Sequence, residues 1–360
     1  MSTTTKSPKK VARAAYKIAK STLPQYAHRY SPKKFTQPQL FVCLVLKIFF
    51  KTDYRGIVAI LNDSDDLCKC FGLICIPHFT TLQKASKRLL RLKVANKLLH
   101  RTVEQSTIDL AAVDSTGHIS RYFVRRKRSK QLETQERTYY RRFPKLAVIC
   151  DCKNHLILSA ITTRGPSPDV NQFCKTLKPA ADQFRINHLL ADAGYDSENN
   201  HQYARNVHQI KTTIPPKHGR ATTKLPKTKY RREMRTHFDE ENYGQRWQVE
   251  TVFSMIKRNF GSALRARRYW SQCREMMLLA LTHNIAIILF VKELFYRAGL
   301  TPFLALDSLN AARDIKLKHW NQRWVFAKPT RARRSWWVSN VSRTRIFSRA
   351  FRFWAISMSL

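Results

Sequence analysis

Short apolar runs between residues 108 and 214 constrain the fold of this chain more than any other feature. Five runs have the length of a strand: 108–113, 146–150, 156–161, 186–191 and 210–214. The second and third runs are separated by residues 152–155, a spacing that predicts a hairpin of antiparallel strands. Helical patterns fill 170–184 and 197–207. The order strand, strand, strand, helix, strand, helix, strand therefore predicts an α/β fold with a mixed sheet flanked by helices.

The regions on either side of the sheet have a different character. Thr36 precedes Gln37 and Pro38, a capping residue followed by an early-helix proline, and leucines recur at helical spacing after Thr81. The predicted organisation is a flexible basic arm (1–30), a helical domain (31–105), the sheet domain (106–298, with a basic insertion at 217–237) and a basic tail rich in Trp and Arg (299–360), for which disorder is one interpretation.

Charge narrows the class of partner. The 360 residues contain 66 Lys and Arg against 24 Asp and Glu, a formal net charge of +42. Such an excess indicates a polyanionic partner, first nucleic acid and second an anionic membrane surface. The basic stretches 121–128 and 137–145, interleaved with aromatic residues, favour DNA contact over a merely solvated loop.

Cysteine use and hydropathy weigh against a secreted or membrane protein. Eight cysteines are too sparse for a disulfide scaffold, and we find no secretory signal, so we expect a cytoplasmic, nucleoid-associated protein. The longest apolar stretch, 276–291, is short for a bilayer span and is interrupted by His283 and Asn284, which favours a buried helix and no membrane partner.

Two aspartates follow directly on apolar strands. Asp114 closes the first run and Asp192 closes the fourth, and each is followed within three residues by a glycine. Open α/β sheets place their sites outside the strand ends, where such carboxylates emerge. The structural alternative is that each aspartate is a turn former or a helix cap.

Glu250 supplies a third carboxylate on a predicted helix over 239–260. Tyr243, Arg246, Glu250 and Lys257 fall within an arc of about 60° at about 100° per residue. Apolar residues fill the adjoining arc and would pack on the sheet. An Arg and a Glu four residues apart can also be a plain surface ion pair.

Three carboxylates together would form a site of hard oxygen ligands. Mg²⁺ or Mn²⁺ prefers such ligands, and two ions about 4 Å apart can activate an attacking oxygen and stabilise the leaving oxygen of a phosphodiester. Without a cation the three would repel one another. The candidate ligands are Asp114, Asp192 and Glu250.

These motifs resemble those of a known family. The pattern Tyr243-x2-Arg246-x3-Glu250-x6-Lys257 resembles the signature that DDE transposases of bacterial insertion sequences carry around their catalytic glutamate. Residues 112–116 and 190–196 resemble the two aspartate motifs of that family, in the same order. The resemblance covers roughly residues 30–290.

The resemblance implies a ribonuclease H-like core with Asp114, Asp192 and Glu250 as catalytic residues and ligands of two Mg²⁺ (or Mn²⁺) ions. It implies that Tyr243, Arg246 and Lys257 contact DNA. The implied partners are double-stranded DNA, as terminal inverted repeats and target, and a second copy of the chain, because family members hold two ends in a synaptic complex. Residues 31–105 would bind ends or dimerise. The implied reaction is hydrolysis at the element's end, followed by attack of the freed 3′-hydroxyl on target DNA.

Other interpretations remain open from the sequence. The chain could be an inactive DNA-binding relic or repressor of transposition, or a general metal-dependent nuclease. Cys68, Cys70, Cys75 and His78 could bind zinc, but their spacing and apolar neighbours favour ordinary core cysteines. Asp169 follows Pro168 and is interpreted as a helix cap, with a metal role as the weaker alternative.

Overall fold

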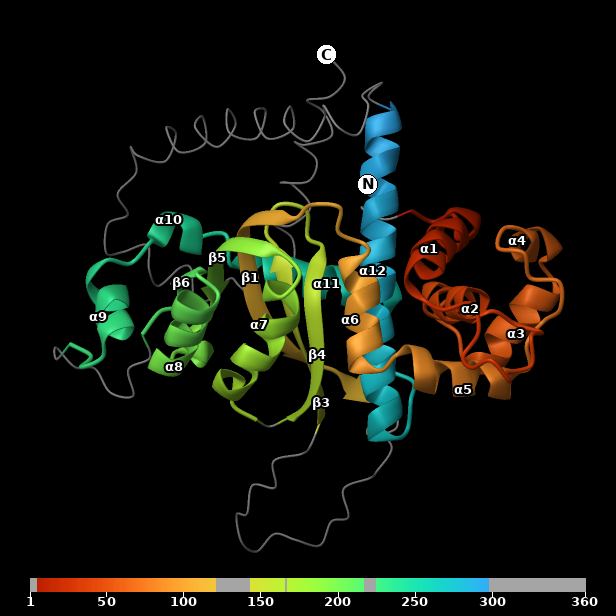
Figure 1. Ribbon diagram of the computed structural model, residues 1–360, viewed down its shortest axis with the longest axis horizontal. Helices are drawn as coiled ribbons and strands as arrows, with labels where there is room; N and C mark the ends of the chain where they lie inside the picture. The colour runs from red at the N-terminus through yellow and green to blue at the C-terminus, as the bar shows by residue number, and fades with distance from the viewer. Residues whose placement is uncertain (1–4, 121–142, 166, 217–224, 298–360) are drawn as a thin grey trace, which may run out of the picture. The chain divides into compact units, whose positions relative to one another are not determined.

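A five-stranded mixed sheet lies at the centre of the described residues of the computed structural model (Figure 1). Its strands are β1 (Thr107–Gly117), β3 (Phe143–Asp151), β4 (Ile157–Gly165), β5 (Arg185–Ala191) and β6 (Lys211–Thr213). They lie in the order β4-β3-β1-β5-β6. Strands β1, β5 and β6 pair in parallel, while β3 runs antiparallel to both of its neighbours. The predicted hairpin and mixed sheet are confirmed.

The structure describes residues 5–120, 143–165, 167–216 and 225–297. The basic stretch 121–128, most of 137–145, residues 217–224 of the insertion and the predicted tail 299–360 lie outside these residues. The chain divides into two units, residues 1–293 and 294–360, so that the N-terminal helices and the sheet belong to one unit.

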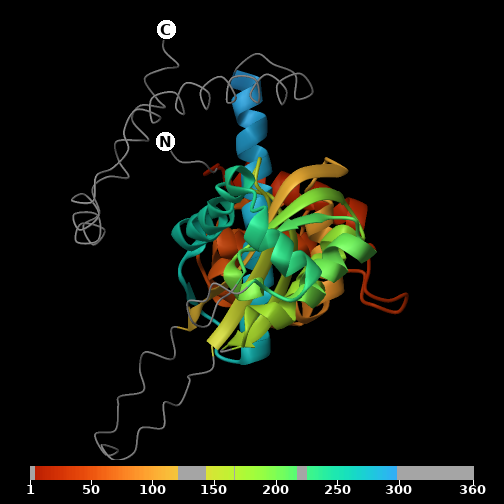
Figure 2. The same ribbon diagram turned by 90° about the vertical axis from the view of Figure 1, so that its left-hand side faces the viewer.

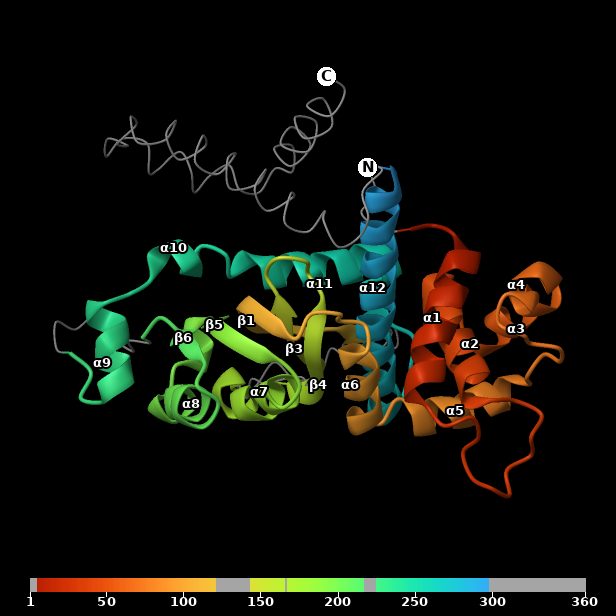
Figure 3. The ribbon, with the colours of Figure 1, turned by 45° about the horizontal axis from the view of Figure 1, so that its top comes forward.

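Helices cover both faces of the sheet, as Figure 3 shows. Helix α11 (Trp247–Phe260) lies on one face and contacts β1 and β3, whereas α7 (Phe173–Ala181) and α8 (Glu198–Gln202) lie on the other. Residues on both sides of the central strands are therefore buried, which explains why Ala111, Val113 and Leu189 belong to continuous apolar runs rather than alternating ones.

Shorter elements connect these layers. Their bounds are η2 (Asp169–Gln172), η3 (Ala193–Tyr195), the short π-helix η4 (Tyr203–Val207), and the small sheet that pairs β2 (Ile119–Ser120) with β7 (Ala263–Leu264). The predicted helices at 170–184 and 197–207 correspond to η2 with α7 and to α8 with η4.

Helix α12 (Tyr269–Arg297) passes between the sheet and the N-terminal helices (Figure 1). Among the described residues, Tyr269–Phe290 is long and apolar enough to cross a membrane by length and composition, but 78% of the window is buried within the protein. The buried Asn284 side chain accepts from Ile157 N–H at 2.9 Å and donates to the Ile157 carbonyl and to Thr102 Oγ1, each at 2.8 Å. These bonds satisfy its polar atoms and fix α12 against β4. The prediction of a buried helix is confirmed.

The N-terminal region consists of helices joined by loops, and the first helix begins at Pro8. Its helices are α1 (Pro8–Thr22), α2 (Gln37–Phe49), α3 (Tyr54–Asn62), α4 (Asp65–Lys69), α5 (Phe79–Leu89) and α6 (Leu92–His100). Helix α2 begins with a capping box, in which Thr36 Oγ1 accepts from Gln39 N–H and Gln39 Oε1 accepts from Thr36 N–H.

Two local expectations differ from the structure. Within residues 1–30, expected to form a flexible arm, residues 8–22 form α1, because Val11, Ala12, Ala15 and Ala19 make an apolar stripe that packs on α2. The helix expected over 239–260 is divided into α10 (Glu240–Tyr243) and α11 by a turn at 244–246, so Tyr243 and Glu250 lie on separate helices.

Candidate active site

The two predicted aspartates lie next to each other at one edge of the sheet. In the parallel pairing of β1 with β5, Val113 is the register partner of Ala191, and Asp114 and Asp192 are the next residues along the two strands. Each carboxylate accepts a hydrogen bond from the backbone N–H of the following residue at 2.7 Å. Asp192 directly follows β5, as the sequence predicted, but β1 continues to Gly117, so Asp114 lies within its strand and not at its end. The parallel pairing still brings together two aspartates that are 78 positions apart.

Glu250 approaches this edge from α11. Buried Val249, Val252 and Ile256 hold the helix against the sheet, which places Glu250 toward the edge of the packed face. The side chain of Glu250 is 56% exposed, and its Oε1 accepts from Arg246 Nη2 at 2.6 Å. The same guanidinium lies with Nη1 3.7 Å from Asp114 Oδ2. Arg246 therefore bridges the glutamate and the first aspartate.

The other two residues of the four-residue signature also reach this region. Lys257, at the far end of α11, donates from Nζ to Thr116 Oγ1 at 2.7 Å, two residues beyond Asp114 on β1. Tyr243 on α10 is half-buried; burial raises the pKa of its phenol, and the charge of Asp192 adds to this shift while Arg246 opposes it. All six predicted site residues are thus gathered around the β1–β5 edge and the α11 face.

The structure adds a carboxylate to this edge that the sequence interpretation did not place there. Asp169, at the start of η2, accepts from Ser115 Oγ at 2.7 Å and forms an ion pair with Lys145 Nζ. Ser115 directly follows Asp114, so Asp169 is one side chain away from the predicted catalytic pair. The interpretation of Asp169 as a helix cap is wrong, because Pro168 is the N-cap of η2 and the Asp169 side chain makes no capping hydrogen bond. A metal role was only the weaker alternative, and the pairing of Asp169 depends on the β3–β4 hairpin, which no local pattern reveals.

Tyr195 is buried next to these carboxylates, and the sequence did not predict its role here. It lies three residues after Asp192, is 1% exposed and stacks at a tilt on Phe173 with ring centroids 6.1 Å apart. Burial raises the pKa of its phenol well above the usual range, and the charges of Asp169 and Asp114 raise it further. Tyr195 is therefore a neutral hydroxyl packed beneath a group of carboxylates.

The environment of Asp114 disfavours the ionised form of its carboxyl group. Burial raises the pKa of the Asp114 carboxyl to about 6, and the negative charges of Asp192 and Asp169 add to this effect. The Ser115 N–H and the Arg246 guanidinium act in the opposite direction but do not cancel it. A further cation at this edge would be stabilised by Asp114 and Asp192 together.

The donor set fits a divalent cation in part. Asp114 and Asp192 offer adjacent carboxylate oxygens, the ligand type that Mg²⁺ and Mn²⁺ prefer. Among the described residues, however, no three His, Cys, Asp or Glu side chains form a group that could hold a metal ion, and Glu250 is paired with Arg246. The same finding applies to the cysteine cluster, in which Cys68 is buried and Cys75 is exposed.

Comparison with known proteins places this edge within a family domain. Residues 105–285, about half of the chain, match the family model described as Transposase DDE domain. No curated protein matches the chain. Among solved structures, the chain is similar to a piggyBac transposase in a cryo-EM synaptic complex with hairpin DNA, at 11% identity and a TM-score of 0.39, covering 92% of this chain and 81% of that one. The matched segment contains β1, β5 and α11 with Asp114, Asp192 and Glu250, and on this match the chain belongs to the DDE transposase family.

Proposed function

We propose that this chain is a transposase that cleaves DNA at the ends of its own element and joins the freed ends to target DNA. One observation carries the proposal: Asp114 and Asp192 lie side by side on neighbouring parallel strands within the DDE domain, and Arg246 connects Glu250 to Asp114. The chain thus has three carboxylates of the expected type at one sheet edge.

We infer that the core is ribonuclease H-like. The support is its topology, in which β3 alone among the described strands of the sheet runs against the other four and α11 packs over β1 and β3. In such an arrangement the catalytic groups come from the centre of the sheet and from a helix lying on it, as Asp114, Asp192 and Glu250 do here.

Asp114 and Asp192 would hold the divalent ions, Mg²⁺ or Mn²⁺, with Glu250 joining them after leaving Arg246. Bound ions supply Lewis acidity, which activates an attacking oxygen and stabilises the leaving oxygen in phosphoryl transfer. The protein's own contribution is a pair of oriented carboxylates, whose hydrogen bonds to the Ser115 and Ala193 N–H groups fix their direction.

Arg246 and Lys257 are suited to a terminal phosphate. A guanidinium binds phosphate oxygens in a planar, bidentate manner, and Lys257 adds a point charge on the same side of β1. When Glu250 turns to the ions, a DNA phosphate would replace its carboxylate as the partner of Arg246. Tyr243, which lies near Arg246 and Asp192, would pack against the same DNA end.

The remaining assignments extend the resemblance to bacterial insertion sequences. We propose double-stranded DNA with terminal inverted repeats and target DNA as substrates, a homodimer in the synaptic complex, and a cytoplasmic, nucleoid-associated location. The net charge of +42 supports a polyanionic partner of this kind.

The decisive experiment incubates the purified protein with Mg²⁺ or Mn²⁺, a duplex carrying the element's ends and a supercoiled target plasmid. The proposal expects cuts at the ends and joined products in the plasmid. Cutting of any DNA without joining would instead identify a general nuclease. Binding without cutting in either metal would identify an inactive relic. Asp109→Asn serves as a matched control, because Asp109 is exposed at the opposite end of β1.

A further inference from the structure

The segment between β6 and α11 is fastened to the open edge of the sheet by a set of ion pairs. It contains α9 (Lys229–Thr236) and α10, which lie beside β6 and α8, as seen in Figure 1 and from the β6 side in Figure 2. Most of this segment was predicted only as a basic insertion. The contacts show instead that α9 has an inner face and an outer face with different roles.

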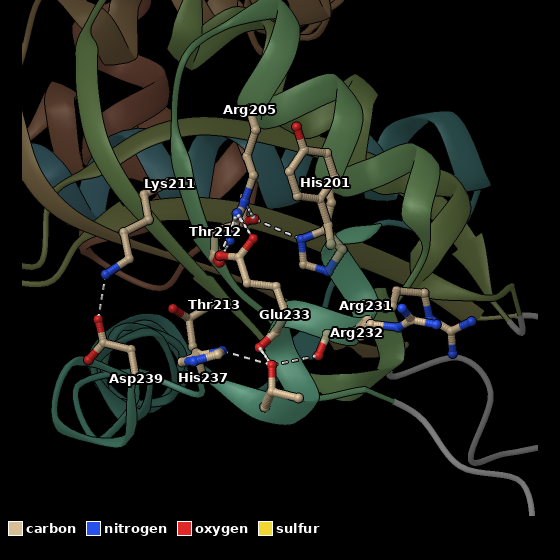
Figure 4. Close-up of polar contacts among 12 residues, drawn as sticks. His201, Arg205, Lys211, Thr212, Thr213, Arg231, Arg232, Glu233, His237 and Asp239 are labelled. Carbon is tan, nitrogen blue, oxygen red and sulfur yellow. Dashed lines mark hydrogen bonds and ion pairs between the residues drawn. The ribbon is translucent and has the colours of Figure 1, made fainter. Parts of the chain in front are cut away.

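The inner face is held by Arg205, whose position Figure 4 shows. Its Nη1 donates to both carboxylate oxygens of Glu233 on α9 at 2.8 Å, while its Nε and Nη2 donate to the Thr212 hydroxyl and carbonyl on β6, also at 2.8 Å. A second pair, Lys211 with Asp239 at 2.8 Å, fixes the start of α10 to the same strand. One guanidinium thus joins α9 to the sheet edge.

The beginning of α9 is joined to the loop that follows Asp192. Arg231 pairs with Asp196 at 2.8 Å, and the side chain of Asp196 is only 1% exposed. Glu198 accepts from the backbone N–H groups of Tyr230 and Arg231, at 3.1 and 3.2 Å. These N–H groups belong to the first helical turn, where a carboxylate is favoured. The start of α9 is therefore tied to the chain segment that immediately follows Asp192.

The outer face of α9 carries only cations and a threonine. Lys229, Arg232 and Arg235 are exposed and fall within an arc of about 120°, on the side away from buried Met234. Among the described residues, no carboxylate makes an ion pair with any of the three. The cations that pair with carboxylates are Arg205, Lys211 and Arg231, which all lie on or face the inner side.

We propose that the outer face of α9 binds the sugar–phosphate backbone of duplex DNA and holds it beside the Asp192 loop. This inference depends on the proposed DNA partner and adds where, and by which residues, the backbone is held. From Lys229 to Arg235 the helix rises about 9 Å, a length comparable to two or three phosphates along one strand. The contacts would be independent of base sequence.

A membrane surface fits this face less well. Helices that lie on anionic membranes combine a cationic face with an apolar one that enters the lipid. The apolar and aromatic residues of α9, Tyr230 and Met234, face the protein, so no apolar side chain of the helix is available for lipid. The charge pattern therefore points to phosphates in water rather than to a lipid boundary.

The test measures the salt dependence of DNA binding without metal, so that no cleavage contributes. The affinity of the full chain for a random duplex of about 30 base pairs is measured between about 50 and 200 mM KCl. The triple variant Lys229→Gln, Arg232→Gln, Arg235→Gln is compared with a matched triple variant, Lys175→Gln, Lys178→Gln, Arg185→Gln, which removes three exposed cations from α7 and the start of β5.

The α9 variant is expected to bind at least about tenfold more weakly. Its log–log salt slope should be smaller by up to about 2.7, since each phosphate that the protein no longer neutralises reduces the slope by about 0.9. The α7 variant should change both quantities much less. Arg232→Lys with Arg235→Lys should keep the wild-type slope, because it preserves both positive charges, and circular dichroism of the α9 triple variant should match that of wild type.

Equal losses of affinity in the two triple variants, or a wild-type slope in the α9 variant, would overturn the proposal. Binding to vesicles rich in anionic lipid is measured in parallel. The proposal would also be overturned if the α9 variant lost affinity for these vesicles and not for DNA. Failure of the transposase proposal is a separate result: wild-type protein would bind DNA through α9 and yet neither cut nor join the element's ends.

Discussion

Carboxylates on two sides of the central sheet have pKa values that are shifted in opposite directions. At the β1–β5 edge, burial raises the pKa of Asp114 to about 6, and Asp192 and Asp169 add negative charge rather than relieve it. At the β6 side, the Lys211 ammonium and the Asn242 amide hold the pKa of Asp239 far below its usual range. Asp114 is therefore buried among negative charges that Arg246 does not offset, whereas Asp239 is held by a lysine and an amide.

This difference distinguishes carboxylates that anchor a helix from carboxylates of the candidate active site. On the β6 side, partners are present for four carboxylates, as lysine, arginine or backbone N–H groups, and these contacts hold a basic helix in place: Asp196, Glu198, Glu233 and Asp239. At the β1–β5 edge, Asp114 lies close to Asp192 and Asp169, and the described cations there are Arg246, Lys145 and Lys257. Burial of the Asp114 carboxyl beside other carboxylates costs stability, and groups with such shifted pKa values cluster at functional sites.

Removing a carboxylate from the β1–β5 edge should have the largest effect. Asp114→Asn, Asp192→Asn and Glu250→Gln should each lower end cleavage by about a thousandfold or more, because bound metal contributes several kcal/mol and each 1.4 kcal/mol is tenfold. Gel assays of end cleavage measure the loss, while DNA binding should persist. Asp109→Asn should cleave at the wild-type rate; a similar loss there would remove the distinction between the two ends of β1.

Breaking a matched pair on the β6 side should instead affect folding. Arg231→Gln leaves the Asp196 carboxylate buried without its guanidinium and should lower the free energy of unfolding by about 3 kcal/mol. Urea unfolding followed by circular dichroism measures this. The double variant with Asp196→Asn should recover much of the loss, and Lys9→Gln, which breaks the exposed pair with Asp66, should leave the urea midpoint unchanged. Equal midpoints in the single and double variants would contradict the role given to this pair.

The pH dependence of Asp114 gives a smaller effect of defined sign. Its folded pKa, about 6, lies above the unfolded value of 3.8, so the stability linked to its proton is present below about pH 4 and is lost as pH rises through 6. In metal-free protein, Asp114→Asn should therefore be more stable than wild type above pH 6, by on the order of 2 kcal/mol. Adding Mg²⁺ should reduce this advantage; an advantage that is unchanged by Mg²⁺ would argue against a cation at Asp114.

The stability contributed by His201, whose Nδ1 lies 2.7 Å from Thr212 Oγ1 on β6, should change with pH in the opposite direction. Burial lowers the pKa of its imidazole to about 4 from 6.5, and Arg205 contributes in the same sense. Its contribution to stability is present above pH 6.5 and is lost as pH falls toward 4. His201→Gln should flatten this acid limb by about 1 kcal/mol near about pH 5.5, as measured by urea unfolding across that range. An unchanged acid limb would show that the imidazole already carries its proton in the folded protein.

Much of the fold could be predicted because local patterns agree with the final structure. The apolar runs, the hairpin spacing and the Thr36 cap each specify one element, and β1, β3, β4 and β5 form where the sequence indicates. Helix α1 was missed because its stripe of alanines is weakly apolar and is interrupted by lysines and arginines. The turn at 244–246 was missed because the helical period continues across Gly244.

Only the part of the site that lies in local sequence motifs could be predicted. Asp114 and Asp192 were both predicted at strand ends; the parallel strands do bring them together, but Asp114 lies three residues before the end of β1. The ion pair of Asp169 with Lys145, the bridging position of Arg246 and the burial of Tyr195 depend on contacts between elements distant in sequence. The anchoring of α9 by Arg205 and Arg231 has the same origin, because both arginines resemble ordinary basic residues in the sequence.

The most direct test of the catalytic role of this edge is a crystal structure of the protein with Mn²⁺ and a cleaved element end, using the anomalous signal of manganese. We expect manganese within about 2.3 Å of oxygens of Asp114 and Asp192, with Glu250 turned toward the ions and Arg246 on a DNA phosphate. Manganese bound elsewhere, or absent from this edge while Arg246 stays paired with Glu250 beside bound DNA, would contradict that role.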